Sequence, residues 1–409
     1  MQWKSCSKPL MILAALLGLG AYGAAATVTV LYSFKDRTDG YSPAGVIMVD
    51  GKLYGTTATG GAYDSGTVFE LVHTSSGWAK TALHEFTGGA DGWNPTPGLV
   101  ADKAGRIYGA AGQILKSGVG GIIFEISPDS DAESRFKVIY AFRGYGPSAL
   151  TIDGAGTLYG VTAGGGGDGC FHGQGCGTVF HLSPGRNGKW KLTTLHRFSG
   201  SDGYFPMAPL YRDATGNLYG TTEGGGGRGC KGTLGCGTVF ELSPSGDGWK
   251  FAVLHRFAGG TDGCSPLGAL TMDREGALYG ATPDCGDGMG VVYRLILSGG
   301  RWQESILYRF GRPPDAALPA AGVLFGSDDT MYGTAFEGGT FYQGAIFKLE
   351  RSGGSWKESV PFSFDVSDGD DPVSLVPGGD GKYYGTTWVG GDGSCQGPGC
   401  GLVFEFVPR

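Results

Sequence analysis

The stretch Leu218-Tyr219-Gly220-Thr221-Thr222, followed by Gly237-Thr238-Val239-Phe240-Glu241-Leu242, decides the fold because both parts recur along the chain. The Tyr-Gly dipeptide occurs seven times, with successive tyrosines 54, 51, 60, 60, 53 and 52 residues apart: Tyr54, Tyr108, Tyr159, Tyr219, Tyr279, Tyr332 and Tyr384. A glycine that opens an apolar run ending in Phe or Tyr also occurs seven times: Gly66, Gly121, Gly177, Gly237, Gly290, Gly344 and Gly401. A repeat of this length is typical of a β-propeller blade. Seven copies of each mark predict seven blades.

The repeat around Tyr279 shows how each unit divides into four short strands. Segments rich in apolar and β-branched residues occupy 267–272, 277–282, 290–297 and 303–310, with turn or loop residues between them. Short segments of this kind, bounded by Gly and Asp, are typical of antiparallel strands. We therefore expect an all-β fold with four antiparallel strands in each blade.

The order of the strands predicts how the ring closes. The segment 27–34 has the pattern of a fourth strand and precedes the first complete repeat, whereas the last repeat stops after its third strand at 401–406. Pairing of these two segments completes the last blade and leaves no open sheet edge. The sequence thus predicts a single seven-bladed β-propeller domain over residues 27–409, closed by its N-terminal strand.

Residues 1–26 have the pattern of a signal peptide. Lys4 and Lys8 precede an apolar core at 11–19, and three alanines at 24–26 form a small-residue cleavage site. We expect cleavage near Ala26 and a secreted or periplasmic protein. No later stretch is long and apolar enough to predict a membrane span. The net charge of −7, without a run of Lys or Arg, argues against nucleic acid as a partner.

Eight of the nine cysteines lie after the signal segment, and in an oxidising compartment disulfides are the expected state of such thiols. The spacing predicts three local pairs and one longer pair: Cys170 with Cys176, Cys230 with Cys236, Cys395 with Cys400, and Cys264 with Cys285. A metal site is the alternative. The spacings are wider than the two-residue gap of zinc motifs and few histidines lie nearby, so we expect no metal at the cysteines.

The connections between blades and the loops between second and third strands share one face, because the strands of a blade alternate in direction. Five connections contain Asp-Gly with a proline three residues after the glycine: Asp39, Asp91, Asp202, Asp262 and Asp368. Asp in this pattern caps a turn and Gly takes a positive φ, which requires no ligand. The alternative is a ring of carboxylates that binds Ca²⁺ or cationic groups, but separate blades space them too widely for one ion. We expect no cofactor, with Ca²⁺ as the one candidate.

Aromatic residues on this face favour a binding function. They are Tyr41, Trp93 and Tyr204 directly after the Asp-Gly pairs, Tyr145 in a shortened loop and Trp388 in a glycine-rich loop. Exposed aromatic rings suit stacking on sugars and also contact with protein partners. The alternative is that they pack against adjacent loops. Three histidines at one strand-four position, His84, His196 and His255, are interpreted as packing residues.

The motifs Leu-Tyr-Gly-Thr-Thr at 218–222 and Gly-Thr-Val-Phe-Glu-Leu at 237–242 resemble those of the choice-of-anchor tandem repeat GloVer-containing proteins. The likeness covers the whole chain after the signal segment. The resemblance implies an exported repeat protein, and it implies no particular activity because none is established for the family.

Three functions are consistent with these observations, and we favour an exported binding propeller that holds a glycan or an extracellular protein on its loop-rich face. The first alternative is a secreted glycan hydrolase or lyase that uses carboxylates such as Asp91 and Asp202 near the channel mouth. The second is a structural component of the envelope or matrix. No catalytic motif is recognisable, so we favour a protein without enzymatic activity, and we expect it to be monomeric.

Overall fold

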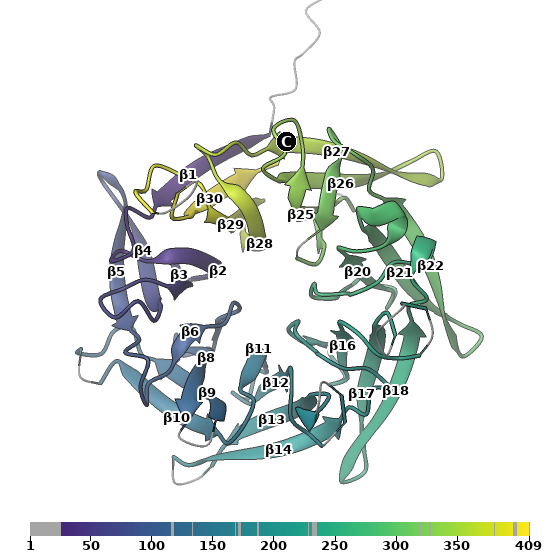
Figure 1. The fold of residues 1–409 in the computed structure, drawn as a ribbon, viewed down its shortest axis with the longest axis horizontal. Helices are drawn as coiled ribbons and strands as arrows, with labels where there is room; N and C mark the ends of the chain where they lie inside the picture. Colours follow the sequence, from purple (N-terminus) through teal and green to yellow (C-terminus); the bar gives the residue numbers. More distant parts are fainter. Residues whose placement is uncertain are drawn as a thin grey trace, which may run out of the picture.

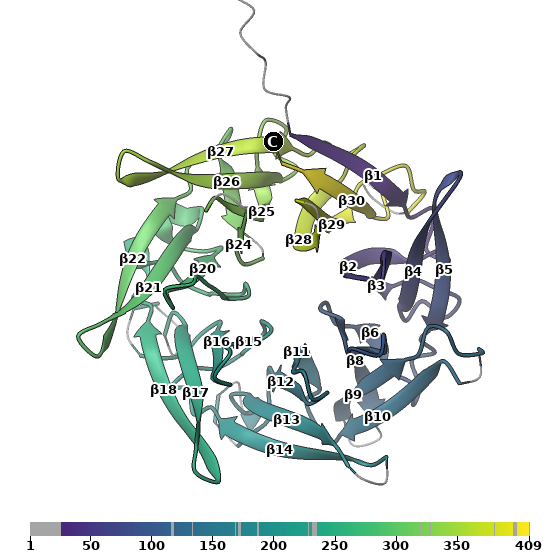
Figure 2. The same cartoon turned by 180° about the vertical axis from the view of Figure 1, so that it is seen from behind.

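The structure, a computed structural model, describes residues 26–408 apart from 116–117, 133, 168, 171–172, 186–187, 228, 231–234, 320, 327–328, 380 and 396–398. Seven antiparallel sheets stand in a ring around a central opening (Figures 1 and 2). The predicted seven-bladed all-β propeller is therefore confirmed. The predicted signal peptide lies outside the described residues except for Ala26 and stays a prediction.

The blades are numbered from the first complete sheet. Blade 1 contains β2 (Tyr41–Val49), β3 (Lys52–Thr59), β4 (Thr67–Thr74) and β5 (Gly77–Glu85). Blade 2 contains β6 (Trp93–Pro95), β7 (Val100–Ala101), β8 (Ile107–Leu115), β9 (Gly118–Ile126) and β10 (Phe136–Phe142). Blade 3 contains β11 (Pro147–Ile152), β12 (Leu158–Thr162), β13 (Thr178–Pro184) and β14 (Trp190–Arg197). Blade 4 contains β15 (Tyr211–Arg212), β16 (Leu218–Thr222), β17 (Thr238–Ser245) and β18 (Gly248–Arg256).

The 3₁₀ turn η2 (Gly260–Asp262) leads to blade 5, which contains β19 (Thr271–Met272), β20 (Leu278–Thr282), η3 (Gly286–Gly288), β21 (Val291–Ser298) and β22 (Arg301–Arg309). Blade 6 contains β23 (Ala316–Pro319), β24 (Leu324–Phe325), β25 (Met331–Gly338), β26 (Ala345–Ser352) and β27 (Ser355–Ser363). Blade 7 contains β28 (Asp370–Gly379), β29 (Lys382–Val389), β30 (Leu402–Val407) and, as its outermost strand, β1 (Thr27–Ser33).

The ring closes as predicted. β1 runs antiparallel to β30, from Thr27 opposite Val407 to Ser33 opposite Leu402, so the first and last strands lie side by side (Figure 1). The N–H of Phe34 extends the ladder by donating to the carbonyl of Gly401 at 3.1 Å. The last blade thus obtains its fourth strand from the start of the chain, and its third strand is not left as an open edge.

Each of the two repeated glycines has a large group where its side chain would be. The glycine of Tyr-Gly lies under the ring of the strand-three Phe in the same blade, as Gly220 does under Phe240. In six blades the glycine before strand three faces the proline of the next blade, and a Cβ on Gly237 would lie 2.6 Å from Pro266 Cδ; in blade 2, Gly121 faces Gly146 instead. The apolar marks of the repeat are therefore packing positions within and between blades.

The residue before that proline forms a second repeated contact between blades. In six blades it has a positive φ of 46 to 56°: Ser42, Asn94, Phe205, Ser265, Leu318 and Asp371. Each of these residues donates its N–H to a carbonyl of the preceding blade, at 2.8 to 3.3 Å. In blade 5 the regular first strand covers only Thr271–Met272 instead of the predicted 267–272.

Candidate functional site

The Asp residues of the Asp-Gly loops are structural caps. Each accepts the backbone N–H of the residue that follows the strand-four Phe, at 2.6 to 3.1 Å: Asp39 from Lys35, Asp91 from Thr87, Asp202 from Ser199, Asp262 from Ala258 and Asp368 from Asp365. This arrangement agrees with the turn-capping interpretation of the sequence. These carboxylates are bound to their own loops rather than held together at one point.

Asp91 and Asp202 also contact the outermost strands. Asp91 Oδ2 lies 3.2 Å from His84 Nε2, and Asp202 Oδ2 lies 2.9 Å from His196 Nε2. Burial acts to raise the pKa of Asp202, but hydrogen bonds from His196 and Ser199 leave that pKa below its usual value. Both carboxylates are thus directed to outer-strand histidines, and a catalytic role for them near the channel mouth stays a prediction.

The predicted rim aromatics divide into covered and exposed rings. Tyr204 is only 7% exposed and its ring covers Gly224, while Tyr145 is half-buried and covers Gly164. The ring of half-buried Tyr41 lies 5.3 Å from the guanidinium of Arg37. For Tyr204 and Tyr145 the structure favours the packing interpretation. Trp93 and Trp388 keep exposed surface, 37% and 45% respectively.

Trp388 belongs to an aromatic pair that spans two blades. Its ring lies 5.6 Å from the ring of Phe336, with the planes tilted by 38°. Phe336 lies in β25 of blade 6 and Trp388 in β29 of blade 7, and each stands four residues after its Tyr-Gly tyrosine. Ala58 and Ala163 occupy this position in blades 1 and 3. The aromatic side chains at this position of blades 6 and 7 thus meet on one side of the propeller.

Carboxylates border this pair. Glu337 follows Phe336 and is exposed, while Asp370 and Asp371 begin β28 and are half-buried. Burial raises the pKa of Asp371, and the charges of Asp370 and Glu337 raise it further. The Gln343 amide, with its nitrogen toward β28, donates to both oxygens of Asp370 at 2.9 and 2.7 Å. We call Phe336, Glu337, Asp370, Asp371 and Trp388 the blade 6/7 patch.

Further apolar side chains near the blade 6/7 patch are exposed. Phe341 and Tyr342, in the loop between the second and third strands of blade 6, are 53% and 66% exposed. Val366, in the connection to blade 7, is 41% exposed, and its carbonyl accepts the N–H of Gly391 at 2.8 Å. Sequence reasoning found Trp388 and Asp368 in this region but none of the other residues. Aligning the repeats on their tyrosines would also have identified Phe336.

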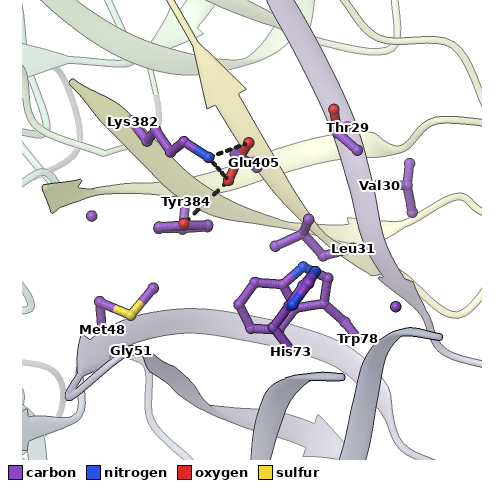
Figure 3. Close-up of a pocket in the computed structure, with 12 residues that line it drawn as sticks. Thr29, Val30, Leu31, Met48, Gly51, His73, Trp78, Lys382, Tyr384 and Glu405 are labelled. Carbon is purple, nitrogen blue, oxygen red and sulfur yellow. Dashed lines mark hydrogen bonds and ion pairs between the residues drawn. The ribbon is translucent and has the colours of Figure 1, made fainter. Parts of the chain in front are cut away.

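A cavity of about 670 Å³ lies on the opposite face, where blade 7 meets blade 1 (Figure 3). Leu31, Met48 and Trp78 supply apolar walls, and Glu405 binds both Lys382 and Tyr384, with the Lys382 Nζ at 3.0 Å and the Tyr384 hydroxyl at 3.1 Å. Blade 1 repeats this arrangement, with Glu70 binding Lys52 and Tyr54. The polar groups of the cavity therefore have a structural role that recurs in the next blade.

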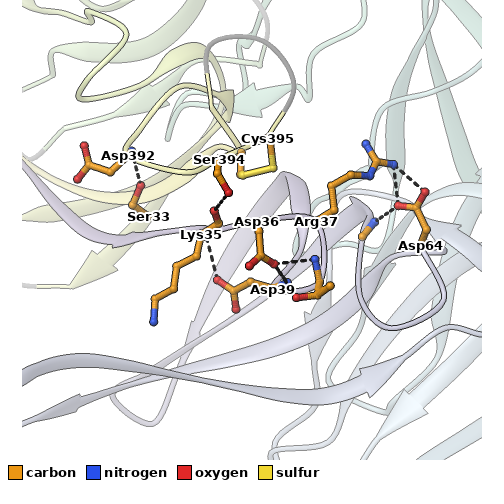
Figure 4. The surroundings of a disulfide bond; sticks show 12 residues. Ser33, Lys35, Asp36, Arg37, Asp39, Asp64, Asp392, Ser394 and Cys395 are labelled. Atoms are coloured by element: carbon orange, nitrogen blue, oxygen red, sulfur yellow. Dashed lines mark hydrogen bonds and ion pairs between the residues drawn. A yellow bond between two sulfur atoms is a disulfide. The ribbon is translucent and has the colours of Figure 1, made fainter.

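All four predicted disulfides are present in the structure. The Cys395–Cys400 bond lies in the loop beside the start of the chain (Figure 4). In that loop, the N–H of Ser394 donates to the carbonyl of Lys35 at 2.8 Å, and the N–H of Asp392 donates to Ser33 Oγ at 3.0 Å. This disulfide loop thus holds the closing strand to the last blade.

Comparison with protein families gives a match that extends from residue 21 to residue 409. The Gloeobacter/Verrucomicrobia repeat matches residues 21–234, 117–323 and 228–409. The chain belongs to this family. The expected resemblance to GloVer-containing proteins is thereby confirmed. No curated protein matches the chain.

Two solved structures of similar fold are described as an oxidase and a lyase, and both have low sequence identity to this chain. A fungal alcohol oxidase in complex with copper has a TM-score of 0.58 and 14% identity, and the match covers 94% of this chain and 77% of that one. The polysaccharide lyase Uly1 has a TM-score of 0.53 and 13% identity, with 90% of each chain covered. At such identities the likeness shows the propeller fold alone.

In the part of the chain that the structure describes, no helix has the length and apolar character to cross a membrane. The four disulfides are consistent with an extracellular protein.

Proposed function

We propose that this propeller is an exported glycan-binding protein whose ligand binds at the blade 6/7 patch on the loop-rich face. The observation that carries the proposal is the pair of exposed Trp388 and half-buried Phe336, bordered by three carboxylates. Aromatic faces bind the apolar C–H surface of a sugar ring, and carboxylates accept hydrogen bonds from its hydroxyl groups. A glycan satisfies both kinds of group at once.

The other candidate locations are less suitable for this ligand. The Asp-Gly carboxylates are bound within their loops, and Tyr204 presents little surface. The cavity between blades 7 and 1 has its Lys382, Tyr384 and Glu405 groups bound to one another. The blade 6/7 patch combines the exposed ring of Trp388 with the exposed carboxylate of Glu337 and the half-buried carboxylates of Asp370 and Asp371.

A glycan array probed with residues 27–409 tests this proposal. We expect an oligosaccharide ligand, with affinity about tenfold or more weaker after Trp388→Ala, since a central aromatic contact is removed. Leu297→Ala is the control, because Leu297 is 56% exposed in the outer hairpin of blade 5 on the opposite face. Binding that survives Trp388→Ala but is lost in Trp93→Ala would place the ligand on blade 2 and contradict the proposal.

A glycan hydrolase or lyase is the second candidate, favoured by the raised pKa values of Asp370 and Asp371, both of which result chiefly from burial. A carboxyl group with a raised pKa can serve as a general acid. Incubation of the glycans identified on the array with the protein would reveal cleavage products. Product formation that is abolished by Asp371→Asn, with binding retained, would assign catalysis to the patch. Asn suits the left-handed backbone at position 371.

A further inference from the structure

A repeated junction links the outermost strands of adjacent blades. At each of five junctions, a Tyr or His stands two residues before the strand-four Phe. Its side chain meets the loop carboxylate and a side chain of the next blade. These sets are Tyr32, Asp39 and Lys80; His84, Asp91 and Phe136; His196, Asp202 and Phe251; His255, Asp262 and Glu304; and Tyr308, Asp315 and Glu358. The third member varies most in chemistry.

An aromatic ring completes two of the three histidine junctions. The His84 ring stacks on Phe136 at 3.6 Å with the planes 9° apart, and the His196 ring stacks on Phe251 at 3.7 Å and 3°. In the third, Glu304 of β22 takes the place of the phenylalanine beside His255. This junction therefore joins an imidazole and two carboxylates.

The nitrogen and oxygen atoms of this third junction lie close together, but they are not hydrogen-bonded as closely as in the other two histidine junctions. His255 Nε2 lies 3.5 Å from Asp262 Oδ2, longer than in the other two histidine junctions, and donor atoms of His255, Asp262 and Glu304 all lie within 4.8 Å of one another. His255 Nε2 and Glu304 Oε1 are both inaccessible to solvent, and neither makes a hydrogen bond of normal length and geometry to the side chains around it. Buried donors and acceptors without partners are costly, which indicates that a further group satisfies them.

We propose that His255, Asp262 and Glu304 bind a divalent transition-metal ion, with Zn²⁺ as the best fit. Three protein ligands of nitrogen and carboxylate type are a set that zinc accepts, with water in the remaining position. Metal–ligand distances of about 2.1 Å in a tetrahedron place donors about 3.4 Å apart, close to the His255–Asp262 separation. Ca²⁺ is less suitable because it prefers six or more oxygen ligands.

The surroundings leave the proposed site net negative. Arg309 is the nearby cation, and its guanidinium donates to the carbonyl of Thr261 at 3.1 Å in the same loop. One positive charge against the two carboxylates favours a cation. Because His255 lies on β18, Asp262 in the connection and Glu304 on β22, the ion would join blade 4 to blade 5.

Calorimetric titration with Zn²⁺ of chelator-treated protein covering residues 27–409 tests the proposal. We expect one equivalent of Zn²⁺ to bind and to raise the melting temperature, and Ca²⁺ to bind much more weakly. Glu304→Phe reproduces the aromatic junctions of His84 and His196, so it is expected to retain the fold and lose the Zn²⁺ response. Glu304→Gln, which keeps the volume of the side chain, is expected to weaken binding about tenfold or more.

Glu358→Phe at the next junction is the matched control and is expected to leave the Zn²⁺ stoichiometry unchanged. The absence of Zn²⁺ binding in the unsubstituted protein overturns the proposal, since Glu304 then shares a proton with Asp262 instead of a metal. Binding that persists unchanged in Glu304→Gln and Glu304→Phe overturns it as well, because the ion then binds elsewhere.

Discussion

At the scale of single residues, the glycine before strand three tests whether contact between blades or backbone conformation determines its identity. Gly237 has φ +101°, and a Cβ there would lie 2.6 Å from Pro266 Cδ and 2.5 Å from the carbonyl of Thr222. Gly288 has φ +97° but open space around it. We expect Gly288→Ala to cost about 1–2 kcal/mol of unfolding free energy from the left-handed backbone alone. Gly237→Ala adds the collision with the next blade and is expected to cost about 3 kcal/mol or more. Urea denaturation measures both, and equal losses would show that the contact contributes nothing.

Predictions for single residues succeeded where the same residue recurs in every repeat. They failed where the residue contacts a partner in another blade or loop. Proline and glycine marks could be interpreted as packing positions because they recur. The burial of Tyr204 could not be predicted from the sequence, because it depends on the backbone of the loop at Gly224. The Phe336–Trp388 contact combines residues 52 positions apart whose equivalents in other blades are mostly not aromatic, so a single repeat gives no sign of it.

At the scale of strands, the junction between blades 5 and 6 makes stability depend on pH. Glu358 of β27 faces Asp315, whose Oδ2 already accepts from the Tyr308 hydroxyl and the N–H of Gly311. Burial first, and then the charge of Asp315, raises the pKa of Glu358 well above its usual value. The folded protein then binds more protons than the unfolded chain above about pH 4.5, so stability is lost as pH rises from there. We expect Glu358→Gln to raise the melting temperature at pH 8 and to have little effect at pH 4. A gain of equal size at both pH values would show that packing, rather than charge, is responsible.

The strands themselves were largely predictable, because four segments with the same pattern recur in every unit. The exceptions are the innermost strands, which are divided in blades 2 and 6 and only two residues long in blades 4 and 5. The left-handed residue before the proline was also missed, because neither Ser265 nor Leu318 reveals this backbone conformation by its side chain. The carboxylate pairs of the outer junctions were also missed, since they form only when two blades are side by side.

At the scale of the whole molecule, the ring depends on a junction made by seven residues. β1 completes blade 7, and removing residues 27–33 would expose the edge of β30 together with buried side chains such as Val403 and Tyr384, whose cluster Leu31 packs against. At about 1 kcal/mol for each lost ladder hydrogen bond, the deletion costs about 5 kcal/mol, comparable with the total stability of many domains. We expect the shortened protein to melt far below the parent or to associate through the exposed edge, as seen by calorimetry and light scattering. A melting temperature within a few degrees of the parent would show that the blades hold the ring without this strand.

The closing strand should be exchangeable among blades, because every blade has the same pairing of third and fourth strands. Thr27 lies opposite Val407, so a short turn can join residue 408 to residue 26, and the turn between β4 and β5 can be opened at residues 75–76. The permuted chain then begins with the fourth strand of blade 1 and ends with its third, which is the native closure moved by one blade. Because β4 and β5 pair along their length, from Thr67 opposite Glu85 to Thr74 opposite Gly77, we expect unfolding free energy within about 2 kcal/mol of the parent. A permutant opened between β3 and β4 would leave two strands at each end and is the control. If that control proves as stable as the first permutant, the offset between the ends of the chain contributes nothing to closure.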